Sequence, residues 1–596
     1  MRIHFLANLH HRLVPGYLVL WTILNGLTLT VFPAVHSDEA WLAGLAQAYL
    51  DQGRVGATEP FFDLFPRQPH AFKMLFHVLQ AGLIELLGFD VFAVRLLSLL
   101  AAVVSLILVY WGLARWTGRR DLALGLMIAL SLQPLFLTTA HLARQESLIL
   151  AVLAAAFTVL PQIQQPRQGF WFGVLLGGAA LIHPNALFPA VMTGLILLWN
   201  TLAGRLSLKT LLLFGAGLAV AGSLLVALSL WVSPGFLENY AEFGANLAVD
   251  AAPSQRGANL QQFVRQLWRQ DNGTYWLPDV RGLLVATVVL AMLGLALQLS
   301  MLLGVGRRRQ WLLNNDQESR SPGVRLLETG LLGLGGFVLV LFVIGRFNPT
   351  SIVFLLIPLV WLLGGIFCLK WRPVGPLLLA IVVVWAGAAA LPHEFGSFVS
   401  QRIATGEDPY QVYSADIRRH LPDKASVLGN LSAGFVLQQS ADFFYDVRNL
   451  TYVTDNIGYS EHRLESEKIS LDYDPNAAPL PQASDTSATS SPAVEAAVAS
   501  YLQERGINMV IWYEEYDFIL RNPDWWVLYE IRPGRTADPA VLRALKAILE
   551  QEGELIHTFA APVYGTRVVR YQGDYPWAVS MYRLDWAASG GTPPTR

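Results

Sequence analysis

The chain has 596 residues, of which 54% are hydrophobic and only 14% are charged. A soluble protein carries roughly a quarter charged residues, so this composition excludes an ordinary soluble protein and predicts an integral membrane protein. The single cysteine, Cys368, excludes an intrachain disulfide and a metal site with several cysteine ligands.

Eleven apolar stretches are predicted to span the membrane as helices. Many of them approach or exceed the roughly 18 apolar residues that indicate a spanning helix, and 147–160 and 169–183 are the shortest. The predicted spans are 14–34, 91–113, 122–140, 147–160, 169–183, 185–202, 209–232, 282–304, 326–345, 350–369 and 373–392.

Basic residues in the loops predict the orientation of these spans. Four loops that fall on the side of the N-terminus are rich in Arg and Lys: 115–120, 205–209, 307–309 and 370–372. Since positive loops stay in the cytoplasm, we expect a cytoplasmic N-terminus in the plasma or inner membrane. The loops 35–90 and 233–281, and the chain after about residue 393, are then expected outside.

The composition changes near residue 393, which divides the chain into a predicted membrane domain, 1–392, and a predicted extracytoplasmic domain, 393–596. Predicted strands at 426–431, 507–516 and 566–573 are interspersed with amphipathic helices at 492–506 and 538–553. This pattern predicts a small α/β domain. A stretch near 474–492, rich in Pro, Ala, Ser and Thr, predicts a disordered loop.

Polar side chains gather where the predicted spans reach the outer surface. Asp38 and Glu39 directly follow the first span. Further outer turns carry His141, Arg144, Glu146, His183, Asn185, Arg346 and Asn348. Charged groups near hydrocarbon are costly and usually face a cavity or a partner. Both signs at one depth therefore predict a polar pocket at the outer membrane surface.

Each of these residues also has a structural interpretation. Asp38 and Glu39 have the sequence context of a helix N-terminus, where acids are favoured as caps. Arg144 and Arg346 are placed to extend toward phospholipid headgroups, as arginines at helix ends often do. Two histidines without a third ligand at a recognisable spacing are weak evidence for zinc.

The order of these motifs resembles the GT-C glycosyltransferases. The similar branch contains the protein O-mannosyltransferases and the lipid A aminoarabinose transferase. The stretch "FFDLFPRQPHAFKML" is similar to a motif of that branch, with Asp63, Lys73 and Met74 in fitting places, although its prolines are not adjacent. "GRFNPTSIVFLLIPLVWLLGG" resembles a late span of the family, with Phe347 where tyrosine is usual. The resemblance covers roughly residues 14–370.

The resemblance implies transfer of a sugar from a polyprenyl-phosphate donor to an acceptor hydroxyl outside the membrane. It places Asp38 as the general base, with Glu39 in support. The leaving group is a phosphate monoester on a lipid, and negative charge develops on it. The cations expected to stabilise this charge are Arg346, Lys73 and Arg144. Further residues of the expected pocket are Asp63, His70, His141, Glu146, His183 and Asn348. Some family members use a divalent metal, and Asp38, Asp63, Glu146 and the histidines are candidate ligands here.

Two other classes of function stay open at the level of the sequence. One is a polytopic transporter or flippase, although the chain shows no repeated halves and its charges cluster at one face rather than at midplane. The other is a non-catalytic, membrane-anchored protein that binds glycans through its C-terminal domain. The expected partners are a polyprenyl-phosphate-linked sugar, an acceptor glycan, lipid or protein, and membrane lipid; no nucleic acid is expected.

Overall fold

The computed structural model divides the chain into two compact units, which are described separately. The residues that it describes are 2–53, 70–245, 253–269, 278–303, 322–344, 349–369, 379, 382–384, 409–450, 453, 491–521, 539–560 and 578–586. Unit 1 comprises Met1–Pro33 and Gln68–Ser400, and unit 2 comprises Ala34–Arg67 and Gln401–Arg596. The outer loop 35–90 was expected with the membrane helices, and the structure instead places its first half in the same unit as the C-terminal region.

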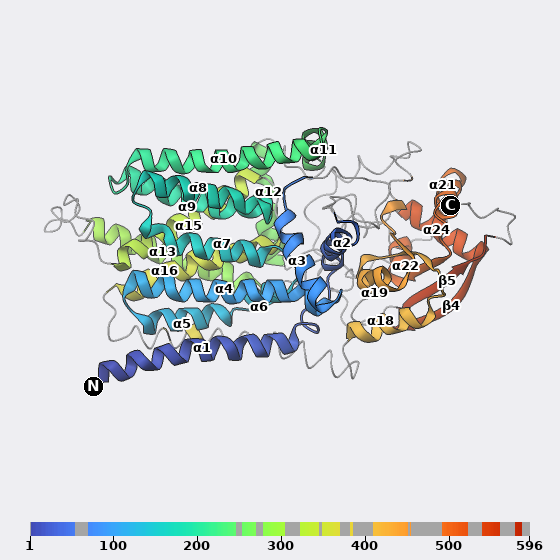
Figure 1. Ribbon diagram of the computed structural model, residues 1–596, viewed down its shortest axis with the longest axis horizontal. Helices are drawn as coiled ribbons and strands as arrows, with labels where there is room; N and C mark the ends of the chain where they lie inside the picture. Colours follow the sequence, from blue (N-terminus) through green and yellow to red (C-terminus); the bar gives the residue numbers. More distant parts are fainter. Residues whose placement is uncertain are drawn as a thin grey trace. The chain divides into compact units, whose positions relative to one another are not determined.

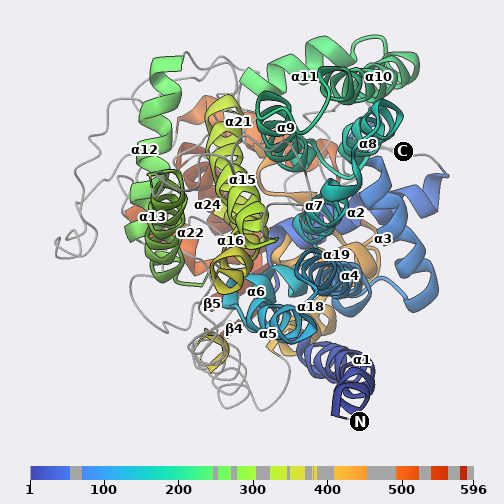
Figure 2. The same cartoon turned by 90° about the vertical axis from the view of Figure 1, so that its left-hand side faces the viewer.

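Unit 1 is made of helices (Figure 1). They are α1 (Arg2–Thr28), α3 (Met74–Leu87), α4 (Val91–Thr117), α5 (Arg120–Ser131), α6 (Pro134–His141), α7 (Glu146–Val159), η1 (Leu160–Gln162), α8 (Pro166–Gly178), η2 (Ala179–Leu181), η3 (Pro184–Ala186), α9 (Leu187–Leu202), α10 (Leu208–Val232), α11 (Phe236–Ala245), α12 (Pro253–Arg269), α13 (Arg281–Leu303), α15 (Pro322–Ile344), η4 (Pro349–Leu355) and α16 (Leu356–Cys368). Figure 2 looks along the long helices and shows α8 beside α10 and α15 beside α16.

Among the described residues, six helices are long and apolar enough to cross a membrane, and a bent pair makes a seventh candidate. The bent pair is α5 and α6, which the sequence predicted as one straight span over 122–140. The two helices meet at an angle of 66°, at a break that ends at Pro134. Proline lacks the N–H that would continue the helix, which accounts for the break. The predicted number of eleven spans stays a prediction, and most of the last one, 373–392, lies outside the described residues.

Glycines let α8 and α10 pack with their backbones nearly touching. A Cβ atom added at Gly173 would collide with the carbonyl oxygen of Phe214, and one added at Gly217 would collide with that of Phe170. Small residues at such contacts are typical of helices that associate within a bilayer. Other surfaces of unit 1 expose large apolar side chains, such as Leu224 of α10 and Met292 of α13. Such exposure is expected for a surface that faces lipid.

Unit 2 is an α/β domain that also contains the helix following α1. Its elements are α2 (Ser37–Gln52), α18 (Pro409–His420), β1 (Ser426–Gly429), η5 (Leu431–Ala433), α19 (Gly434–Ser440), β2 (Phe443–Asp446), α21 (Pro492–Glu504), β3 (Met509–Tyr513), α22 (Glu514–Arg521), α24 (Pro539–Glu552), β4 (Gly553–Ala560) and β5 (Ala578–Leu584). The sheet order is β2-β1-β3-β5-β4. Strand β1 pairs in parallel with β2 and β3, whereas β5 pairs antiparallel with β3 and β4.

The predicted fold class is confirmed: a polytopic α-helical membrane protein with a C-terminal α/β domain. The predicted strand at 426–431 is β1, and the predicted helices at 492–506 and 538–553 are α21 and α24. The predicted strand at 507–516 is too long, because the chain turns into α22 at Glu514. The predicted strand at 566–573 lies outside the described residues, as does the predicted loop near 474–492 apart from its last two positions.

Candidate active site

The two adjacent acids at the start of α2 have different surroundings. The backbone N–H of His36 donates to Glu39 Oε2 over 2.7 Å, and the backbone N–H of Asp38 donates to His36 Nδ1 over 2.8 Å. This reciprocal capping box satisfies N–H groups that the first helical turn leaves without intrahelical partners. The capping interpretation therefore holds for Glu39, which is fully buried.

The side chain of Asp38 is 25% exposed, and its Oδ1 lies 3.8 Å from His36 Nδ1. Its carboxylate lies one residue before the capping acid, and the hydrogen bonds of the box use only its backbone N–H. Of the two acids, Asp38 is thus the one with a solvent-accessible carboxylate at the helix N-terminus. A helix N-terminus favours the ionised form of a carboxylate, which is the form that accepts a proton.

In unit 1, a buried arginine and a buried histidine hold the end of α1. Arg95 of α4 donates to the carbonyl oxygens of Leu29 and Phe32, over 2.8 and 3.3 Å. His141 Nδ1 lies 2.8 Å from the Phe32 oxygen, and its Nε2 lies 2.9 Å from Asn25 Oδ1. Leu29 and Phe32 follow the last residue of α1, and these two side chains give their buried carbonyl oxygens hydrogen-bond partners. Sequence reasoning missed Arg95, although a lone arginine inside the apolar run "FAVRLLSLL" was a signal for it.

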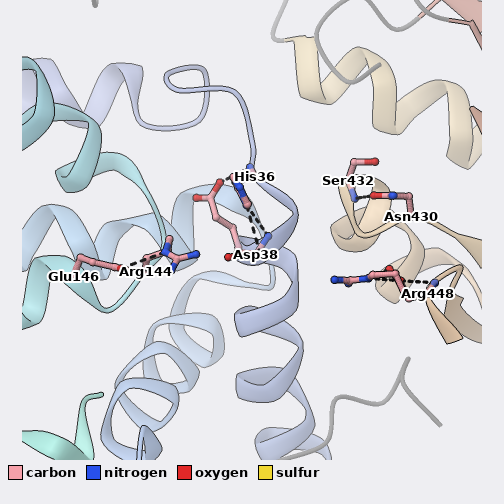
Figure 3. A network of polar contacts seen from close by, with 9 residues as sticks. His36, Asp38, Arg144, Glu146, Asn430, Ser432 and Arg448 are labelled. Atoms are coloured by element: carbon pink, nitrogen blue, oxygen red, sulfur yellow. Dashed lines mark hydrogen bonds and ion pairs between the residues drawn. The ribbon is translucent and has the colours of Figure 1, made fainter. Parts of the chain in front are cut away.

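Arg144 and Glu146 form a buried pair at the start of α7 (Figure 3). The arginine Nε donates to Glu146 Oε2 over 3.2 Å, and its NH2 donates to Oε1 over 3.1 Å. Glu146 Oε1 also accepts from the hydroxyl of Thr350, over 2.7 Å. The acid therefore orients the arginine as a planar fork and connects α7 to η4. Arg144 and Glu146, predicted at one outer turn, do meet.

Lys73 has a backbone conformation that is rare for its residue type. It precedes α3 with φ 68° and ψ −6°, the left-handed region that favours glycine. Such a residue is held in place by its surroundings, and here His70 and Phe72 pack against Phe236 and Tyr240 of α11. A strained backbone at a lysine often marks a functional site.

The remaining predicted residues are structural in their visible contacts or lie outside the described residues. His183 accepts at Nδ1 from the backbone N–H of Asn185, over 3.0 Å, and so caps η3. Asp63, Arg346 and Asn348 lie outside the described residues. Among the residues that the structure does describe, no group of three His, Cys, Asp or Glu side chains is arranged to hold a metal ion.

Comparison with known proteins supports the resemblance predicted from the sequence. The family model for dolichyl-phosphate-mannose-protein mannosyltransferases matches residues 27–236. A comparison with curated protein sequences gives no match.

Among solved structures, the chain is similar to the ArnT protein of Cupriavidus metallidurans in the apo state. The identity is 13% and the TM-score 0.50, over 95% of this chain and 98% of that one. The same protein bound to undecaprenyl phosphate gives a TM-score of 0.44 at 13% identity, over 74% and 91%. The archaeal oligosaccharyltransferase AglB of Archaeoglobus fulgidus gives 0.43 at 11% identity, over 91% and 73%. The predicted GT-C type of fold is confirmed by the apo ArnT structure.

Proposed function

We propose that this chain, which resembles the GT-C membrane glycosyltransferases, transfers a sugar from a polyprenyl-phosphate donor to an acceptor hydroxyl on the extracytoplasmic side of the membrane. The observation that carries the proposal is the match of the mannosyltransferase family model to residues 27–236. The matched range contains Asp38, Lys73 and Arg144, the residues to which the resemblance assigns the chemistry. The name of that family describes a lipid-phosphate-linked sugar as the donor.

Asp38 is the proposed general base. An acceptor hydroxyl that attacks the anomeric carbon must lose its proton, and a positioned carboxylate contributes about 10²–10⁴-fold to such a step. The partial exposure of Asp38 supports this role, because a base must reach an acceptor that arrives from solvent. Glu39 supports the site indirectly: its carboxylate fixes the first turn of α2 through the N–H of His36.

The leaving group is proposed to be a lipid monophosphate, stabilised by cations of unit 1. Arg346 is the first candidate by resemblance, and Lys73 is supported by its left-handed backbone before α3. The charge of Arg144 is already offset by the carboxylate of Glu146. We therefore assign Arg144 a supporting part in phosphate binding.

A paired substitution in α2 tests the proposed base. We expect Asp38→Asn to lower turnover at least a hundredfold at unchanged expression, the scale of a lost general base. Asp51→Asn is the matched control, because Asp51 is an exposed acid near the other end of α2 that contacts Gln47. Turnover is measured as release of polyprenyl phosphate from lipid-linked sugars extracted from the host's own membranes. Wild-type turnover in purified, folded Asp38→Asn protein would remove Asp38 from the mechanism.

A further inference from the structure

The helix that carries Asp38 packs within unit 2 against the segment that follows β1. Ala40 of α2 is fully buried, and Gln438 of α19 donates to its carbonyl oxygen over 3.3 Å. Gly434, the first residue of α19, lies so close that an added Cβ would be 2.6 Å from the Cβ of Ala40. The absence of a side chain at Gly434 is therefore what allows this approach.

A second contact holds the same turn of α2. The guanidinium of Arg448 lies over the ring of Trp41, 4.8 Å from its centroid. Asp446 fixes that guanidinium, since Arg448 Nε donates to Asp446 Oδ1 over 2.7 Å and NH2 donates to Oδ2 over 3.3 Å. Trp41 follows Asp38 by three residues, so the two side chains share one face of the helix.

We infer that the C-terminal domain is the positioning device for the proposed general base, and that Gly434 and Arg448 are positioning residues for Asp38. This inference rests on the proposed function. Asp38 lies two residues from Ala40, about 3 Å along the axis of a rigid helix, so a displacement of Ala40 displaces Asp38. The C-terminal domain then has a part in catalysis without itself contributing a reacting group.

The geometry gives the size of the expected displacement. Carbon atoms in ordinary contact are about 3.5–4.0 Å apart, so a methyl group at Gly434 requires α19 and Ala40 of α2 to separate by about 1 Å. Both atoms belong to short, rigid side chains on helices, and neither can turn aside. A misplacement of about 1 Å at a reacting group can cost ~10²-fold in rate. We expect the binding of the donor lipid to be unchanged, because the substitution alters none of the proposed phosphate-binding residues, Lys73, Arg144 and Arg346.

An exchange of side-chain size tests the inference in the full-length protein. We expect Gly434→Ala to lower kcat between tenfold and a hundredfold at unchanged KM for the donor. Ala40→Gly removes the opposing methyl group, so the double variant Gly434→Ala/Ala40→Gly should return to within about threefold of the wild-type kcat. A double variant as slow as Gly434→Ala would overturn the inference, and so would a wild-type kcat in Gly434→Ala itself.

A matched variant separates positioning from stability. A Cβ added at Gly553 would collide with the backbone of Leu549, so Gly553→Ala strains the same domain where α24 meets β4. We expect it to lower the Tm while the folded fraction keeps the wild-type kcat. A tenfold loss of kcat in folded Gly553→Ala would show that any strain in the domain has the same effect, and would count against a specific role for Gly434.

A third variant keeps the inference testable if Gly434→Ala does not fold. Arg448→Lys keeps the positive charge beside Asp446 but loses the planar group that rests on Trp41. We expect a several-fold fall in kcat with unchanged KM, and an unchanged kcat would overturn the role of Arg448. Failure of the proposed function has a different signature: folded wild-type protein would then release no polyprenyl phosphate at all.

Discussion

In the part of the chain that the structure describes, each unit contains a buried arginine beside an acid two residues away in sequence, and we compare what else the two pairs contact. In unit 1, Arg144 pairs with Glu146, and in unit 2, Arg448 pairs with Asp446. All four side chains are less than 10% exposed. In the first pair the acid also accepts a hydrogen bond from Thr350 of η4, and in the second the arginine also lies over the ring of Trp41 of α2.

This difference teaches that the same local pair can perform two tasks. In the first pair, Glu146 connects α7 to η4 through Thr350, and it also holds Arg144 in a fixed orientation as a hydrogen-bond donor. In the second pair, Asp446 orients Arg448, and the flat guanidinium of Arg448 supports the ring of Trp41 in α2. The partner beyond the pair, and not the pair itself, therefore determines the role of each arginine.

The largest effect is expected when either arginine is removed. Arg144→Ala leaves Glu146 as a buried acid without its cation, and Arg448→Ala does the same to Asp446. Loss of one member of a buried pair costs about 3–5 kcal/mol in the free energy of unfolding. Denaturant unfolding of each variant measures the cost, with the acid-free double variants Arg144→Ala/Glu146→Ala and Arg448→Ala/Asp446→Ala as controls that should lose less. A loss below about 1 kcal/mol in either single variant would show that the remaining carboxylate becomes hydrated. That pair would then behave as a surface ion pair, and the comparison of two buried pairs would fail.

A smaller effect, specific to unit 2, is expected at alkaline pH. Burial raises the pKa of Tyr413 to about 12, although hydrogen bonds from Ser432 and Tyr513 act in the opposite direction. The unfolded chain loses this proton near pH 10 and the folded domain does not, so stability is complete below pH 10 and falls as pH rises toward 12. This difference in pKa corresponds to an energy on the order of 3 kcal/mol. Tyr413→Phe should reduce the fall in unfolding free energy between pH 10 and 12, although the pKa of the neighbouring Tyr513 is also raised by burial. An unchanged profile would exclude Tyr413 as a cause of the fall.

The next effect concerns the outward contact of the first pair. Thr350→Val keeps the shape of the side chain and removes the hydroxyl that donates to Glu146. A hydrogen bond to a charged group contributes about 1.5–3 kcal/mol, and we expect a loss near 2 kcal/mol in the unfolding free energy of the membrane unit. Thr201→Val is the control, because its hydroxyl donates only to the carbonyl oxygen of Leu197 within α9. Equal losses of unfolding free energy in the two variants would contradict the role of Glu146 as the connection between α7 and η4.

Periodicity and composition predicted the parts of the fold that depend on local sequence. The apolar runs predicted the long helices. The stretch 426–431 was predicted as the strand β1, and the amphipathic stretches 492–506 and 538–553 were predicted as the helices α21 and α24. The bend between α5 and α6 was missed because the apolar run resumes directly after Pro134, and the two polar residues before the proline, Ser131 and Gln133, were not taken as a break. β2 was missed because the strand character of "FFYD" comes from its pairing with β1 rather than from its own sequence.

The candidate site was predictable only in its residue types. Adjacent acids after an apolar run indicated both a cap and a base, and only the hydrogen bonds separate Glu39, which caps, from Asp38, which is partly exposed. The contacts of α2 with Gly434 and Arg448 join residues about 400 positions apart, and no local pattern encodes such a pairing. The roles of the acids and of the phosphate-binding cations stay predictions.

Binding of the bare leaving group tests the central claim most directly, because it does not depend on which sugar is transferred. Purified wild-type protein in lipid nanodiscs is titrated with a polyprenyl monophosphate and, as the control, with the polyprenyl alcohol of the same length. We predict that the phosphate binds at least tenfold more tightly, since charge-assisted hydrogen bonds to Lys73 and Arg346 favour it. Lys73→Ala and Arg346→Ala should each reduce that preference, and Arg346→Lys should restore it only in part. Equal affinity of the folded wild-type protein for the phosphate and the alcohol would contradict the account.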